Sequence, residues 1–158
     1  RHRPTFGSSP LKVVPAVRLG DGGEYTVVKR VFHSDSTTLV KVTAADGGTY
    51  AMKRIKIPGR LWQQDFPRNL KNVDREVRSL KSLAWASSVI VSLVDSWLEA
   101  DFNFACIVME FLPYTLDGIF TERVKRKLGP LSIETTERYT TQLIAGLAVI
   151  HNSKLMHR

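Results

Sequence analysis

Short runs rich in Val, Thr, Ile and aromatic residues dominate the chain directly after residue 24. They span 25–32, 39–43 and 49–57, and Asp46-Gly47-Gly48 separates the second from the third. Short runs of these residues between turn signals predict β-strands. An Asp-Gly-Gly turn is typical of a β-hairpin, because glycine tolerates positive φ. The three runs therefore predict an antiparallel meander.

A helical spacing of apolar residues replaces the strand-like pattern from about residue 68 onward. Apolar residues recur there every three or four positions, at Val73, Val77, Leu80 and Leu83. This spacing predicts an amphipathic helix over 68–83. Two strand-like runs follow at 89–98 and 104–111, and two helical stretches follow them at 116–127 and 132–152. Ser132 is expected to cap the last helix, and the order of elements predicts an α+β fold.

Composition narrows the class of protein. The 158 residues are 43% hydrophobic and 24% charged, which is typical of a globular domain. No apolar run reaches the roughly 18 residues of a membrane-spanning helix, and the first ten residues lack the apolar centre of a signal peptide. We therefore expect an intracellular protein, cytoplasmic or nuclear, with no membrane partner. The single cysteine, Cys106, excludes an internal disulfide and a multi-cysteine zinc site, and no metal ligands are expected.

The charge balance predicts attraction to an anion. Lys and Arg number 23 against 15 Asp and Glu, a net charge of +8. The excess is concentrated between Lys53 and Lys81 and around Arg123 to Lys127. Neither cluster is interleaved with aromatic residues as a single-strand-binding groove is, so a nucleic-acid partner is not expected.

Two charged residues stand out because they occupy apolar faces. In the run 49–57 the period of two puts Lys53 on the same face as Ala51 and Ile55. Glu76 lies at the edge of the apolar stripe of the predicted helix. An unpaired buried ammonium is costly, so an inward lysine calls for an inward carboxylate. A structural alternative is that each side chain reaches water at the boundary between sheet and helix.

These residues carry a resemblance to eukaryotic protein kinases. Tyr50-Ala51-Met52-Lys53 resembles their Val-Ala-Ile-Lys strand, and Arg75-Glu76-Val77 resembles the start of their C helix signature. Four later segments resemble kinase elements in the family order. They are a fourth strand at 95–99, a fifth strand running into the hinge at 107–112, the long helix of the C-lobe at 139–151 and the opening of the His-Arg-Asp loop at 155–158. The resemblance implies a five-stranded antiparallel N-lobe sheet with one C helix, followed by the first helices of a truncated C-lobe. It implies an N-terminal arm at 1–24, an N-lobe with the hinge at 25–112 and an incomplete C-lobe at 113–158.

The resemblance also implies an ATP site. Lys53 would hold the α- and β-phosphates and Glu76 would orient it, as the catalytic pair. Small Ala51 would let adenine lie against its strand, with Met109 behind it as gatekeeper. The main chain of the hinge would hydrogen-bond adenine, and a threonine six residues after Met109 would contact the ribose. The expected nucleotide-binding residues are Val31, Leu39, Ala51, Lys53, Met109, Glu110, Leu112 and Thr115.

The glycine-rich loop of kinases is the point of departure. A tight hairpin before Lys53 puts Phe32, Ser34 and Thr37 at the three glycine positions, and this register is favoured because short hairpins outnumber long insertions. In a rival register Gly20, Gly22 and Tyr25 occupy those positions, with an extra strand before Lys53. Glycines at these positions let backbone amides approach phosphates, and side chains hinder this approach.

The implied function is transfer of the ATP γ-phosphoryl group to protein Ser or Thr residues with Mg²⁺. The family's catalytic Asp, Asn and metal-binding Asp are expected beyond Arg158, so the chain as given is expected to be inactive. The alternative is a pseudokinase or interaction module with weak or no nucleotide binding. The strand pattern over 25–53 resembles monopolar spindle kinases, and Asp95-Ser96-Trp97-Leu98-Glu99 resembles the kinases of initiation factor 2.

Overall fold

The computed structural model describes residues 18–19, 25–57, 66–99 and 103–156. The predicted N-terminal arm lies almost entirely outside the described residues. The same holds for Gly20 and Gly22 of the rival loop register and for His157 and Arg158 of the expected catalytic loop.

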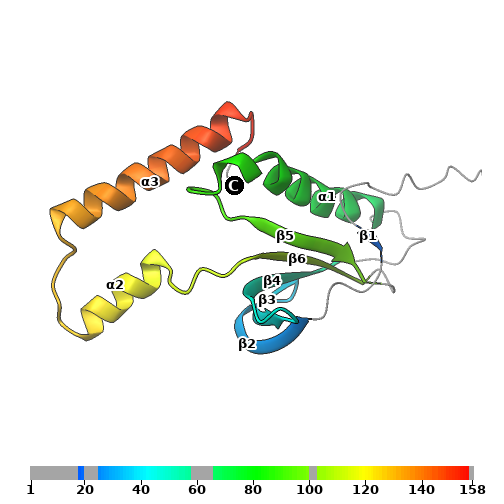
Figure 1. Cartoon of the computed structure of the whole chain (residues 1–158), viewed down its shortest axis with the longest axis horizontal. Coiled ribbons are helices and arrows are strands. Elements are labelled where there is room, and N and C mark those ends of the chain that lie inside the picture. The colour runs from blue at the N-terminus through cyan, green and yellow to red at the C-terminus, as the bar shows by residue number, and fades with distance from the viewer. Residues whose placement is uncertain (1–17, 20–24, 58–65, 100–102, 157–158) are drawn as a thin grey trace, which may run out of the picture.

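The structure contains a six-stranded sheet (Figure 1). Its strand order is β1-β5-β6-β4-β3-β2. The strands are β1 (Arg18–Leu19), β2 (Tyr25–His33), β3 (Thr37–Ala44), β4 (Thr49–Lys56), β5 (Leu93–Leu98) and β6 (Phe104–Glu110). Strands β2 to β6 pair antiparallel, which confirms the predicted five-stranded sheet. The two-residue β1 forms the other edge of the sheet, where it pairs parallel with β5.

The helices follow the predicted order. They are α1 (Phe66–Ser82), the 3₁₀ turn η1 (Ala84–Ala86), α2 (Leu116–Lys125) and α3 (Ile133–Asn152). The strand expected over 89–98 begins only at Leu93. The amides of Val89 and Ile90 both donate to the carbonyl of Ala86, which extends the turn after η1 and keeps these residues out of the sheet.

The Asp46-Gly47-Gly48 hairpin between β3 and β4 is confirmed. Gly47 has φ +82°, and the amide of Gly48 donates to the carboxylate of Asp46 at 2.7 Å. In register, Leu39 of β3 lies opposite Lys53 of β4, and Val40 lies opposite Met52. The hairpin thus aligns β3 with β4 residue by residue.

The sheet has two buried faces. We call the face that carries Lys53 and packs against α1 the inner face, and the face that carries Arg54 the outer face. The inner core contains Val73 and Val77 from α1 together with Leu98, Ala105 and Ile107 from the sheet. In Figure 1, α1 runs along this face beside β5, and α2 and α3 follow from the end of β6.

The outer core is smaller and aromatic. Trp97, Cys106 and Val108 are buried there, and Tyr25 of β2 stacks on Trp97 with ring centroids 5.8 Å apart. Because β6 contributes alternate residues to both cores, Ala105 to Val108 are all buried in succession.

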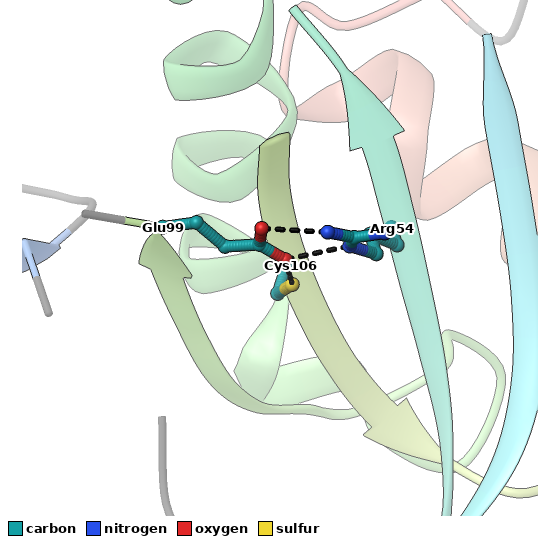
Figure 2. A network of polar contacts seen from close by, with 3 residues as sticks. All are labelled: Arg54, Glu99 and Cys106. Carbon is teal, nitrogen blue, oxygen red and sulfur yellow. Dashed lines mark hydrogen bonds and ion pairs between the residues drawn. The ribbon is translucent and has the colours of Figure 1, made fainter. Parts of the chain in front are cut away.

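An ion pair holds the outer face at the end of β5 (Figure 2). Arg54 donates from Nε and Nη2 to the two carboxylate oxygens of Glu99, each at 2.6 Å. The thiol of Cys106 donates to Glu99 Oε1 at 3.6 Å. Burial, and after it the charge of Glu99, raise the pKa of Cys106 to about 12. Cys106 is buried and is therefore a neutral thiol at physiological pH.

Helix α3 begins where its sequence suggests. Ser132 is the N-cap, and its hydroxyl accepts from the amide of Thr135 at 3.2 Å. Gly146 is buried, and a Cβ on it would lie 3.3 Å from the carbonyl oxygen of Val89. A glycine here lets α3 approach the segment before β5. Among the helices of the described residues, none is long and apolar enough to cross a bilayer.

Candidate functional site

The structure brings Lys53 and Glu76 together. Lys53 Nζ donates to Glu76 Oε1 at 2.6 Å, joining β4 to α1 across the inner face. The two side chains are 29% and 37% exposed, so the pair lies at the margin of the core and remains accessible. The lysine is therefore paired with the carboxylate, and both side chains also keep access to water at the boundary between sheet and helix.

Three expected nucleotide-binding residues surround the pair on the inner face. Leu39 lies opposite Lys53 in the sheet, and Ala51 lies opposite Met109 of β6. Met109 is partly buried and packs against the inner core. The small side chain of Ala51 therefore lies between β3 and Met109, which is held against the inner core.

Val31, one of the expected nucleotide-binding residues, lies at an irregularity of β2. The pairing of β2 with β3 shifts between Arg30 and Phe32, so Val31 is the extra residue of a bulge. Phe32 is the residue that lies opposite Leu39. The ring of Phe32 is 55% exposed, and this aromatic side chain shares the inner face with Leu39 at the first glycine position of the favoured loop register.

The turn between β2 and β3 is closed by its own hydrogen bonds. The amide of Ser34 donates to the carbonyl of Thr37 at 2.8 Å, and the amide of Thr37 donates to Ser34 Oγ at 3.2 Å. These are two of the three glycine positions of the favoured register. Their amides are already satisfied within the turn, whereas glycine-rich loops direct such amides to phosphate.

The two expected hinge residues lie at the end of β6: Glu110 is its last residue and Leu112 follows it. The amide of Glu110 donates to the carbonyl of Ser92 at 3.0 Å, so the Glu110 N–H is committed to the protein. Of the main-chain groups expected to hydrogen-bond adenine at Glu110, this leaves the carbonyl. Leu112 lies beyond the strand and is exposed.

Thr115 caps α2. Its Oγ1 accepts from the amide of Gly118 at 3.0 Å, with the extended backbone that an N-cap residue adopts. A threonine hydroxyl has a second lone pair and one O–H to donate. The cap therefore fixes Thr115 in position and leaves its hydroxyl proton for a further acceptor, such as a ribose oxygen.

Sequence reasoning missed a second cation on this face. Lys41 lies opposite Ala51, and its Nζ is 5.0 Å from the centroid of the Phe111 ring next to the hinge. The alternation of the strand places Lys41 on the same face as Leu39, and this signal was sufficient to find it. With Lys53, and with Lys29 opposite Lys41, it gives the inner face of the sheet three lysines.

The inner face fits a nucleotide unevenly. The paired lysine, the small Ala51 and the anchored Met109 fit an adenine nucleotide, while the closed β2–β3 turn fits its phosphates less well than a glycine loop does. Among the described residues, no three His, Cys, Asp or Glu side chains lie together as ligands of a metal ion.

Comparison with known proteins agrees with this arrangement. The family model of the protein kinase domain matches residues 18–158, so the chain belongs to the protein kinase family. It is 27% identical over 124 residues to mitogen-activated protein kinase kinase kinase ANP1 of Arabidopsis thaliana, covering 77% of this chain and 17% of that protein. It is 28% identical over 114 residues to a probable cell division protein kinase of Encephalitozoon cuniculi, covering 72% of this chain and 32% of that protein. The chain thus spans a third or less of either curated relative.

Proposed function

We propose that the chain is the ATP-binding part of a protein kinase that phosphorylates protein Ser or Thr residues. The Lys53–Glu76 ion pair carries this proposal, because kinases depend on it to place the α- and β-phosphates of ATP. Lys53 would bind these phosphates, while Glu76 holds the ammonium in place. Ala51 and Met109 would enclose the adenine, and the carbonyl of Glu110, the main chain of Leu112 and the hydroxyl of Thr115 would orient the rest of the nucleoside.

Mg²⁺ would neutralise the charge that develops on the phosphates, as it does in protein kinases generally. In the family order, its ligands and the catalytic Asp follow the position of Arg158. We therefore expect the 158 residues alone to bind ATP and to transfer no phosphoryl group. The protein substrate and an intracellular location, cytoplasmic or nuclear, are parts of the same proposal. Membership of the monopolar spindle or initiation factor 2 kinases is a further proposal that rests on the strand segments alone.

One observation favours the alternative of a pseudokinase or interaction module. The amides of Ser34 and Thr37 are bonded within the β2–β3 turn, and Phe32 adds an exposed ring beside Leu39. Both features oppose close approach of phosphates to the backbone. If they dominate, the chain has the shape of a kinase and binds nucleotide weakly or not at all.

Thermal unfolding of the chain with and without ATP and Mg²⁺ separates the two functions. A ligand that binds only the folded state raises its stability by about 2.7 kcal/mol at a hundred times Kd. We expect a rise in Tm that Lys53→Met abolishes and that Lys125→Met, an exposed lysine on α2, leaves intact. No stabilisation at millimolar ATP would reject nucleotide binding and leave the pseudokinase.

Replacing the turn side chains tests the reason for any weakness. Phe32→Gly, Ser34→Gly and Thr37→Gly together should tighten ATP binding if those side chains block the phosphates, because the amides would then be free to turn toward them. An unchanged or weaker affinity would show that the turn does not limit binding.

A further inference from the structure

A hollow on the outer face has no part in the proposed nucleotide site. It has a volume of about 800 Å³ and lies over β2, β3 and β4, opposite the face that carries Lys53. Its apolar lining includes Val40, Met52 and the ring of Phe104, which lie on three adjacent strands. Val40 is 8% exposed, so the floor is firmly part of the sheet. The hollow therefore has a floor of buried and partly buried side chains of the sheet.

Its rim is positively charged. Lys29, Arg30 and Lys56 line it and are exposed, and Asp35 at the turn is its one acidic lining residue among those described. Lys29 lies opposite Lys41 and so projects from the inner face, which leaves Arg30 and Lys56 as the cations of the rim. In the part of the chain that the structure describes, no ion pair neutralises these two cations. Arg54 also lines the hollow, but its charge is already matched by Glu99. The rim thus has an unmatched positive charge above an apolar floor.

The register of the strands shows that part of this charge faces the hollow. Arg30 lies opposite Val40, which lies opposite Met52, and residues that lie opposite one another in an antiparallel pair project from the same face. Lys56 likewise lies opposite Phe104. Arg30 and Lys56 therefore flank the apolar floor from two sides.

We propose that this outer hollow docks an acidic peptide segment of a partner protein, with an apolar side chain on Val40 and Met52 and carboxylates against Arg30 and Lys56. Charge complementarity decides the occupant, since such a peptide matches both the rim and the floor. A nucleic acid matches the rim alone. The ring of Phe104 cannot receive a base on the side that Arg54 covers, because the guanidinium carbon lies 3.6 Å from the ring centroid.

The peptide binds through its side chains rather than as an added strand. Strand β2 is an edge of the sheet, but its pairing with β3 shifts at two places, between Val27 and Lys29 and between Arg30 and Phe32. Bulges of this kind twist an edge away from regular pairing. Docking in the hollow leaves the inner face and its Lys53–Glu76 pair open.

Selection from a library of random 12-residue peptides displayed on phage tests the proposal, with the whole chain as bait. Selected peptides should combine Asp or Glu with Leu, Ile, Phe or Met. Synthetic copies should shift the amide NMR signals of β2 to β4, and their affinity should fall with added salt. Arg30→Glu with Lys56→Glu should weaken binding at least tenfold. The matched reversal of two exposed helix lysines, Lys71→Glu with Lys125→Glu, should change it less than twofold.

The other outcomes overturn the proposal. They are peptides without acidic residues, peptides that bind both double variants equally, signals that shift away from β2 to β4, or a dT12 oligonucleotide that displaces the peptides from this face. Unchanged Tm in each variant shows that the fold is intact. The ATP experiment uses the opposite face, so a negative result there leaves this test unaffected.

Discussion

Lys53→Met removes the ammonium of the central ion pair while keeping most of the side-chain volume. At the observed 2.6 Å, Coulomb's law gives about 1.6 kcal/mol in a water-like dielectric. Both side chains are partly exposed, at 29% and 37%, so ordering of the side chains and solvent screening reduce the net contribution to about 1 kcal/mol or less. The effect on ATP should be larger, because a hydrogen bond to a charged group contributes about 1.5–3 kcal/mol, or roughly 10- to 150-fold in Kd.

The assay is a double-mutant cycle with Lys53→Met and Glu76→Gln, measured by urea unfolding and by titration with ATP and Mg²⁺. We expect a coupling energy of about 1 kcal/mol or less in unfolding and a much larger loss of nucleotide affinity for Lys53→Met. A loss of several kcal/mol in stability would mean that the pair supports the core rather than a ligand. Unchanged ATP affinity would place the nucleotide elsewhere and refute the site.

Three further changes test the fold. Cys106 should react with a disulfide reagent at pH 8 only after unfolding, and fast labelling of the native protein would contradict this. The free energy of unfolding should fall as pH rises from 9.0 toward 12. The reason is that the pKa of Cys106 in the folded state is raised from 9.0 to about 12, so the folded state keeps the thiol proton. Gly47→Ala should lower the free energy of unfolding in urea by about 1–2 kcal/mol, because φ of Gly47 is +82°. No atom lies within 4 Å of the new Cβ, so backbone strain alone causes the loss. A neutral result would mean that the turn rearranges. Ser132→Ala should cost about 1 kcal/mol and reduce helicity by circular dichroism, because Thr135 loses its acceptor; equal stability would show that the cap is dispensable.

The pairing of Lys53 with Glu76 was predictable because each lies on a regular element. The period of two fixed the face of the lysine, and the spacing of Val73 and Val77 fixed the side of the helix on which Glu76 lies. Both elements have buried apolar faces, which leave one way to pack them together. Local pattern was therefore enough to predict this part of the site.

Features that depend on nonlocal contacts were harder to predict. The bulge at Val31 arises from the pairing of two strands and puts Phe32 opposite Leu39, which regular alternation does not reveal. The turn over Val89 looked like a strand because its residues are β-branched, but their amides bond to Ala86. The stacking of Tyr25 on Trp97 joins strands that are far apart in the sequence, and no local signal indicates it.

Two adjacent basic residues of β4 are bonded on opposite sides of the sheet. Lys53 is bonded to a carboxylate of α1 on the inner face, and Arg54 is bonded to Glu99 on the outer face. A slip of β4 by one residue exchanges the faces of its side chains, so it would break both ion pairs at once. Neither pair is strong alone, yet together they penalise every odd-numbered shift of the strand that carries Lys53. The two ion pairs thus help to fix the register of β4, which keeps Lys53 opposite Leu39 and directed toward α1.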